Sequence, residues 1–228
     1  MNRKSISTYV SRLILSLALL LPSSRADAQG FLKLEQDSIP LFRGFALSFD
    51  LVGMAQLQLS DYGQYEGAFR LNLHDQFFPI VEVGLGRANH EEDEVTGLSY
   101  KTTAPYFRLG ADVNIMKKKH TGNRVYVGLR YAYTNYSVDI ARRPTPDPIW
   151  QNNTSFSVDG MSCYQHWLEA VFGLDAKVMG PLHLGWSARY KIRMSHHDGW
   201  LGNTWYVPGF GTQDSSALGA TFNVIIDI

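Results

Sequence analysis

Residues 105–115 read PYFRLGADVNI, and the alternation within this stretch determines how the fold is interpreted. Arg108 and Asp112 occupy one parity, and Leu109 and Val113 occupy the other. Successive side chains of a β-strand point to opposite faces, so this pattern predicts a strand with one charged face and one apolar face.

The same alternation recurs along the chain and predicts eight strands. They cover residues 42–54, 65–74, 80–87, 105–115, 124–136, 164–178, 182–193 and 217–228. Most have the roughly 9 to 11 residues with which a tilted strand crosses a bilayer. Short connections (75–79, 116–123 and 179–181) alternate with long ones (55–64, 88–104, 137–163 and 194–216). Short turns on one side and long loops on the other are typical of outer-membrane proteins. The sequence therefore predicts an all-β, eight-stranded, antiparallel up-and-down transmembrane β-barrel.

The charged face is expected to line the lumen. The apolar parity of the eight strands contains no Asp, Glu, Lys or Arg, and glycines such as Gly84, Gly110 and Gly128 share the charged parity. A narrow eight-stranded interior needs such gaps between long side chains. We therefore expect a structural network of lumen ion pairs and a closed lumen. Its predicted members are Asp50, Glu66, Arg70, Glu82, Arg108, Asp112, Arg124, Arg130, Glu169, Asp175, Lys177, Arg189, Lys191, Arg193 and Asp227. A secreted, soluble lipocalin-like binding barrel stays open as an alternative, because it would place the apolar face inside.

The first 28 residues have the parts of a secretory signal peptide. Arg3 and Lys4 precede an apolar run at 13–21, and small residues surround the expected cleavage site near Ala28. The apolar run is shorter than the ~18 residues that a membrane-spanning helix needs. We expect the protein to be exported and the signal peptide to be removed.

The predicted organisation is a signal peptide at 1–28, a periplasmic N-terminal segment at 29–41 and an outer-membrane β-barrel at 42–228. The formal net charge of the whole chain is zero, so nothing indicates binding to nucleic acid. Cys163 is the single cysteine, so no intramolecular disulfide can form.

The expected partners are outer-membrane lipid, the barrel insertion machinery and a surface ligand bound through the external loops. No cofactor is expected.

His166 is the histidine placed best for chemistry, on the apolar parity near the external end of its strand. A catalytic role would need a serine within hydrogen-bonding reach and a carboxylate to orient the imidazole. No His-x-Ser pattern accompanies His166, so we favour a structural role at the membrane interface. An enzyme that modifies acyl groups of lipid A or phospholipid stays open as the alternative.

Three loop features carry weaker signals. The run 90–94 and the triplet 196–198 contain histidine and carboxylates without a defined metal-ligand spacing, so no metal site is predicted. The last long loop contains four aromatic residues that could contact a sugar or pack as a cap. These are Trp200, Trp205, Tyr206 and Phe210.

Several segments resemble an uncharacterised family of bacterial outer-membrane β-barrels that is defined as a domain of unknown function. They are SDYGQYE (60–66), WLEAVFGLDAKVMGPLHLGWSARYK (167–191), GNTWYVPGFG (202–211) and TFNVIIDI (221–228). The resemblance extends over residues 37–228 and implies a barrel in the cell envelope, without known catalytic residues. The architecture is similar to that of OmpA-type and OmpX-type small barrels. The chain differs from many outer-membrane proteins in ending with Ile228 instead of an aromatic residue. The leading hypothesis is a non-enzymatic role in envelope maintenance or surface contact.

Overall fold

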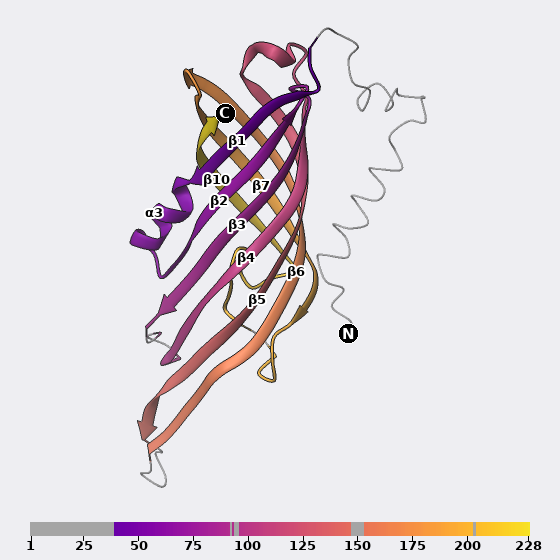
Figure 1. Ribbon diagram of the computed structural model, residues 1–228. Coiled ribbons are helices and arrows are strands. Elements are labelled where there is room, and N and C mark those ends of the chain that lie inside the picture. Colours follow the sequence, from indigo (N-terminus) through magenta and orange to yellow (C-terminus); the bar gives the residue numbers. More distant parts are fainter. Residues whose placement is uncertain (1–38, 92, 94–95, 147–152, 203) are drawn as a thin grey trace, which may run out of the picture. The chain divides into compact units, whose positions relative to one another are not determined.

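The computed structural model describes residues 39–228 except 92, 94, 95, 147–152 and 203. Within them, eight antiparallel strands close into a barrel of order β1-β10-β7-β6-β5-β4-β3-β2 (Figure 1). The strands are β1 (Phe42–Asp50), β2 (Tyr62–Leu73), β3 (Phe77–His90), β4 (Leu98–Asn114), β5 (Arg124–Pro146), β6 (Asn153–Met179), β7 (Leu182–His197) and β10 (Ser216–Asp227). Helix α3 (Leu51–Leu59), the 3-10 turn η1 (Lys119–Thr121) and the short strands β8 (Tyr206–Val207) and β9 (Gly211–Thr212) lie in the connections. The predicted all-β barrel is confirmed. The predicted signal peptide at 1–28 lies outside the described residues.

One end of the barrel has short turns and the other has long loops. A tight turn joins β2 to β3, where His74 and Asp75 have φ angles of 61° and 53°. The Gln76 amide donates to the Leu73 carbonyl at 3.1 Å and closes this turn. Two left-handed residues give a turn whose twist matches that of the flanking strands. We call this end of the barrel the short-turn end and the opposite end the long-loop end.

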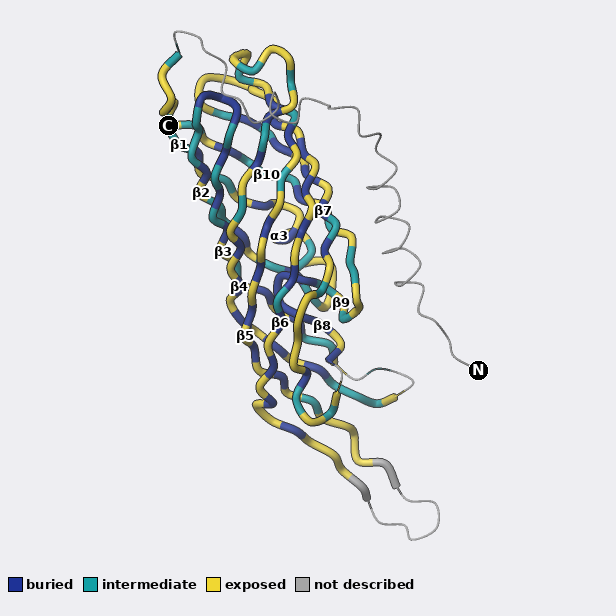
Figure 2. Tube along the Cα trace, turned by 90° about the vertical axis from the view of Figure 1, so that its right-hand side faces the viewer, coloured by how far each residue is buried: buried dark blue, intermediate teal, exposed yellow. Residues whose placement is uncertain are grey.

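Buried and exposed residues alternate along the strands (Figure 2). Arg108 is 0% exposed and the next residue, Leu109, is 53% exposed. On β5, Arg130 is 2% exposed beside Leu129 at 68%. The charged parity therefore faces the lumen, and the apolar parity covers the outside of the barrel.

The lumen has two layers of different chemistry. Toward the short-turn end it contains charged side chains such as Arg70, Asp112 and Asp175. Toward the long-loop end it contains an aromatic cluster that includes Tyr100 and Trp167. The side chains of both layers are buried.

The strands on one side of the barrel are longer than predicted. Residues 88–104 and 137–163 were expected to be loops, but β5 runs to Pro146 and β6 begins at Asn153. The β5–β6 ladder continues through the pair Val138 and Met161, both of which are buried. The alternation continues past the predicted strand ends because the inward side chains of these extensions are still buried.

The first strand is shorter than predicted. Alternation predicted a strand over 42–54, but β1 ends at Asp50 and α3 begins at the next residue. The Asp50 carboxylate accepts hydrogen bonds from the Val52 and Gly53 amides at 3.1 and 3.0 Å. A capping carboxylate satisfies amides that a helix leaves without intrahelical partners, so Asp50 starts the helix. None of the described helices is long and apolar enough to cross a membrane.

Candidate functional site

The centre of the lumen is organised around the carboxylate of Glu82 on β3. Arg189 donates to Glu82 Oε2 at 2.6 Å, Arg108 donates to the same oxygen at 3.1 Å, and Arg130 Nε donates to Oε1 at 3.1 Å. Glu82 is 1% exposed, and the three arginines come from β7, β4 and β5. One carboxylate thus links four strands across the barrel.

Two further carboxylates, Glu66 and Glu169, pair with Arg108 and Arg189. Arg108 pairs with Glu66, and its Nε lies 2.9 Å from Glu169 Oε1. Tyr106 donates a hydrogen bond to Glu66 at 2.5 Å, and Trp167 Nε1 donates to Glu169 at 2.6 Å. The aromatic layer is therefore hydrogen-bonded to the charged layer below it, which lowers the cost of burying the carboxylates.

A second group of ion pairs lies nearer the short-turn end. Arg70 donates to Asp175 at 2.5 Å, and Arg130 Nη1 lies 2.7 Å from Asp112 Oδ1. Arg124 contacts Asp227 at 2.5 Å where the lumen opens at this end. Arg70 and Asp175, like Arg124 and Asp227, come from strands that are distant in sequence and not adjacent in the wall, whereas Arg130 and Asp112 lie on the neighbouring strands β5 and β4.

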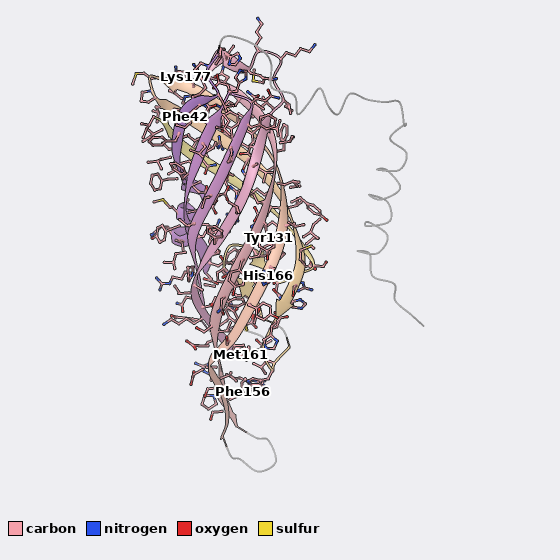
Figure 3. All side chains as sticks on the ribbon, turned by 45° about the vertical axis from the view of Figure 1, so that its right-hand side comes forward. Phe42, Tyr131, Phe156, Met161, His166 and Lys177 are labelled. Atoms are coloured by element: carbon pink, nitrogen blue, oxygen red, sulfur yellow. The ribbon has the colours of Figure 1, made fainter. Side chains whose placement is uncertain are left out.

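Four predicted members of the network have other roles. Asp50 caps α3, and Lys191 donates to the carbonyls of Gly209 and Phe210 at 2.8 and 2.9 Å. Lys177 is exposed at the short-turn end (Figure 3), next to a register shift before Met179, and lines a polar pocket there. Arg193 is half-buried at the level of another register shift and forms no ion pair with the described residues. Parity alone does not account for these bulges.

The last long loop folds into the barrel instead of remaining outside it. Tyr206 and Phe210 are 2% and 1% exposed, and the Gly209 carbonyl accepts a hydrogen bond from Arg108 at 2.8 Å. Gly209 has φ +80°, and a Cβ there would lie 2.5 Å from the ring of Tyr106. We call residues 205–210 the plug. Its sequence signal was the YVPGFG motif, in which only glycine permits the close approach.

Little space remains inside. A cavity of about 10 Å³ lies between the charged layer and β1, lined by residues that include Ser48, Asp50 and Asn223. That volume accommodates about one water molecule. The plug and the ion pairs both occupy the lumen, where Arg108 joins them through Gly209.

His166 lies on the outside of the barrel, in a groove of about 710 Å³ (Figure 3). Its Nδ1 lies 2.6 Å from the Tyr131 hydroxyl, and its ring centroid is 4.6 Å from that of Tyr133. Ser195 is its partner on β7 and also lines the groove. The sequence prediction missed this serine because it is distant along the chain. No carboxylate is among the described residues that line the groove, so a tyrosine holds the imidazole where a hydrolase would use an acid.

A polar pocket of about 230 Å³ lies at the short-turn end and contains Asp75. His120 Nδ1 lies 2.8 Å and Arg43 Nε 3.3 Å from Asp75 Oδ2, and the Asn72 amide donates to Asp75 at 2.6 Å. Burial would raise the pKa of Asp75, but the hydrogen bonds from His120 and Asn72 and the charge of Arg43 outweigh it and lower that pKa below its ordinary value. Asp227, paired with Arg124, lines the same pocket, so the pocket contains two carboxylates that already have cationic partners.

The two histidine-containing loop segments, 90–94 and 196–198, form separate His–Asp pairs in the structure. His90 pairs with Asp61 at 2.6 Å, while two residues of the run 90–94 lie outside the described part. His196 pairs with Asp198 at 3.3 Å. Among the described residues, no group of three or more His, Cys, Asp or Glu side chains could hold a metal ion.

The four loop aromatics also separate. Trp200 is 71% exposed, whereas Trp205, Tyr206 and Phe210 belong to the plug, in which Tyr206 and Phe210 are buried. Trp205 packs edge-on against Tyr62 and Tyr100, with ring centroids 5.7 and 5.6 Å away. The loop therefore does not present its aromatic residues as one surface.

Comparison with protein families identifies the chain. A sequence model of the domain of unknown function DUF6048 matches residues 6–227. The chain belongs to the DUF6048 family. The predicted membership of an uncharacterised family is thereby confirmed.

The DUF6048 chain is also similar to a solved structure, a major outer membrane protein from Thermus thermophilus. The two share 14% sequence identity with a TM-score of 0.45, over 81% of this chain and 98% of the other. No curated protein matches the DUF6048 chain.

Proposed function

We propose that this DUF6048 protein is an exported, integral outer-membrane β-barrel with a closed lumen and a non-enzymatic role in envelope maintenance or surface contact. Outer-membrane lipid surrounds its wall, the barrel insertion machinery receives it, and its long-loop end is available to a surface ligand. The observation that carries the proposal is the outward orientation of the apolar parity.

The exposed fractions support this orientation. Leu129 is 68% exposed, Trp186 62% and Leu109 53%, while Arg108 and Glu169 are 0% exposed. In water, this arrangement would expose a continuous apolar wall and bury charges at a desolvation cost. In a bilayer, the same wall contacts hydrocarbon. A soluble lipocalin-like barrel requires the reverse, with the apolar face inside.

Tyrosines near the long-loop end support a membrane boundary there. Tyr65, Tyr131, Tyr133 and Tyr164 point outward and are between 37% and 50% exposed. Amphipathic rings concentrate where hydrocarbon meets headgroups. The hydrophobic belt would then lie between these tyrosines and the short-turn end.

Two measurements test the proposal. The full chain, expressed with residues 1–28, should fractionate with outer membranes and remain there after an alkaline carbonate wash. The refolded barrel should give no steady conductance in planar bilayers, because the plug and ion pairs fill its lumen. Recovery in the soluble fraction would refute the membrane location, and a steady conductance would refute the closed lumen.

A second candidate function is acyl transfer or hydrolysis on lipid A or phospholipid, with His166 as the base. The pairing of Ser195 with His166 favours it, because both residues line one groove at the tyrosine level. Serine and histidine are the nucleophile and base of many acyl hydrolases. Lipid mass spectrometry of cells that express wild-type protein, His166→Ala or Ser195→Ala tests this candidate. Identical lipid profiles in all three would eliminate it.

A further inference from the structure

The wall of the barrel has a gap on the long-loop side of β1. The pairing of β1 with β10 runs from Ala46–Asp227 to Asp50–Asn223 and ends there. However, β10 continues to pair with β7 as far as Ser216, and β2 pairs with β3 as far as Tyr62. We call the facing edges, residues 216–222 of β10 and 62–66 of β2, the seam. Helix α3 contacts both strands at this place (Figure 1).

The β1–β10 ladder ends at Asp50, whose side-chain carboxylate accepts a hydrogen bond that a backbone carbonyl of β1 would otherwise accept. Alternate residues of β10 direct their amides to β1, as Ile228 does to the Phe45 carbonyl at 2.7 Å. Phe222 belongs to this series, but its amide donates to the Asp50 carboxylate at 3.2 Å. Ala220 and Leu218 continue the series, and no described strand pairs with them on this side.

Helix α3 packs backbone to backbone on β2. A Cβ on Gly53 would lie 2.6 Å from the Gln64 carbonyl oxygen, and a Cβ on Gly63 would lie 2.5 Å from the Leu57 amide nitrogen. Only glycines permit this approach. The Gln64 carbonyl therefore faces a helix at a position where a complete barrel would have the next strand.

The sequence of α3, LVGMAQLQL, is compatible with a strand as well as with a helix. It has no charged residue, and Leu51, Val52, Met54 and Leu59 are exposed. The segment lacks the apolar stripe of an amphipathic helix, whereas its second half alternates leucine with glutamine, which is the period of a strand.

If the pairing register of β1 with β10 and β2 continued through residues 51–55, each of these residues would face either the outside or the lumen with a side chain that suits that face. Leu51 would lie between Phe222 and Tyr65, on the outside, because Phe49 lies between Val224 and Gly67. By the same register, Met54 would point into the lumen between Gly219 and Tyr62, beside the aromatic layer. Ala55 would reach Leu218 on the outside. The extension thus adds apolar side chains to both faces without placing a charge in the membrane.

A bilayer favours the strand form. Tyr65 lies at the tyrosine level, and Leu218 pairs with Tyr190 on β7, so the seam extends from mid-wall to the membrane boundary. Backbone groups in hydrocarbon must be hydrogen-bonded within the protein. We propose that residues 51–55 exchange between the first turns of α3 and an extension of β1 that pairs with β10 and β2 and seals the seam. This inference rests on the membrane location proposed above.

The test is disulfide cross-linking of the full-length barrel, with Cys163→Ala, in phosphatidylcholine vesicles. The pair Ala55→Cys and Leu218→Cys joins residues that are opposite only if the β1 register continues. The control pair is Leu47→Cys and Ile226→Cys, which are already opposite in the same ladder and in the same hydrogen-bonding class. We expect both pairs to form intramolecular disulfides on oxidation, detected as a mobility shift in electrophoresis.

The variant Leu51→Pro distinguishes the two forms. Proline is accepted at the first position of a helix, and Asp50, with φ −83° and ψ 121°, already has the extended conformation that proline requires before it. In the strand form, however, proline removes the amide that would donate to Phe222. We therefore expect Leu51→Pro to lower the cross-linking rate of the 55–218 pair at least tenfold and to leave the 47–226 pair unchanged.

Three results would overturn the inference. The 55–218 pair could stay reduced while the 47–226 pair oxidises, the Leu51→Pro variant could oxidise the 55–218 pair as fast as its parent, or the products could be disulfide-linked dimers. The last result would assign the seam to a second copy of the chain. Carbonate washing of the same vesicles tests the membrane location separately. A chain that is not inserted is removed by the wash, whether or not its cysteines are cross-linked.

Discussion

Replacing Glu82 with glutamine tests the energetic importance of the lumen network. Glu82→Gln keeps the size of the side chain and removes the charge that three arginines contact at 2.6, 3.1 and 3.1 Å. Arg108 and Arg189 would then have only Glu66 and Glu169, and Arg130 only Asp112, while all three arginines stay almost completely buried. Breaking a buried ion pair costs about 3–5 kcal/mol, because the remaining charge has lost water and its partner. Each 1.4 kcal/mol is about a tenfold change in the folding equilibrium, so the expected loss exceeds a hundredfold.

The measurement is urea unfolding of the refolded barrel in detergent, monitored by tryptophan fluorescence and by the heat-dependent mobility shift of folded barrels. Glu91→Gln is the matched control, because Glu91 is exposed and its loss should change the free energy of unfolding by no more than about 0.5 kcal/mol. The double variant Glu82→Gln/Arg189→Met should recover part of the loss, since it removes one uncompensated cation. If the free energy of unfolding of Glu82→Gln equals that of the Glu91→Gln control, the assignment of Glu82 as the centre of the network is refuted.

Three further predictions concern packing, the plug and pH. Gly84→Ala should destabilise the barrel by about 1–3 kcal/mol in the same unfolding assay, because its Cβ would lie 2.2 Å from the ring of Tyr106. Gly67→Ala, whose Cβ would meet Phe49 at an ordinary 3.6 Å, should be nearly neutral, and equal effects would contradict this explanation. Lys191→Met should increase protease cleavage within residues 205–210, because it removes both hydrogen bonds to the plug carbonyls; unchanged cleavage would show that Lys191 does not hold the plug. Asp75→Asn should destabilise the barrel near neutral pH. Because the folded pKa of Asp75 is lowered, its contribution is complete above its ordinary value of 3.8 and disappears as pH falls through the lower folded pKa. Unfolding curves of both proteins across pH 2–7 should therefore converge at the acidic end, and a constant difference would contradict the assigned cause.

Alternation predicted most of the barrel because each strand has one face toward the lumen and one toward the outside, and the outer face has few exceptions to its apolar character. Leu109, Leu129 and Trp186 have the exposure that their parity predicted. The end of β1 was not predictable in this way, since the apolar residues after Asp50 suit a strand as well as a helix and the strand was predicted to run to residue 54, while Asp50 caps a helix. A local hydrogen bond decided between two structures that the periodicity could not distinguish.

The partners within the lumen were beyond sequence reasoning. Parity placed Arg70 and Asp175 on one face, but they are 105 residues apart and meet only because the barrel closes. Lys191 was expected to pair with a carboxylate and instead binds plug carbonyls, because the last loop folds inward. His166 was found by its position, whereas Ser195 needed the strand register.

The unequal strand lengths make the rim of the barrel asymmetric. β5 and β6 have 23 and 27 residues, while a tilted strand crosses hydrocarbon with about 10. At about 3.4 Å per residue, β5 continues for roughly 40 Å along its own direction beyond that need. Residues 98–102 of β4 pair with this extension, which therefore has a third strand at its base and the minimum width for a sheet that stands in water. A large molecule that approaches the mouth would therefore meet a tall sheet on the side of β4 to β6, and a much lower rim where β1 ends at Asp50.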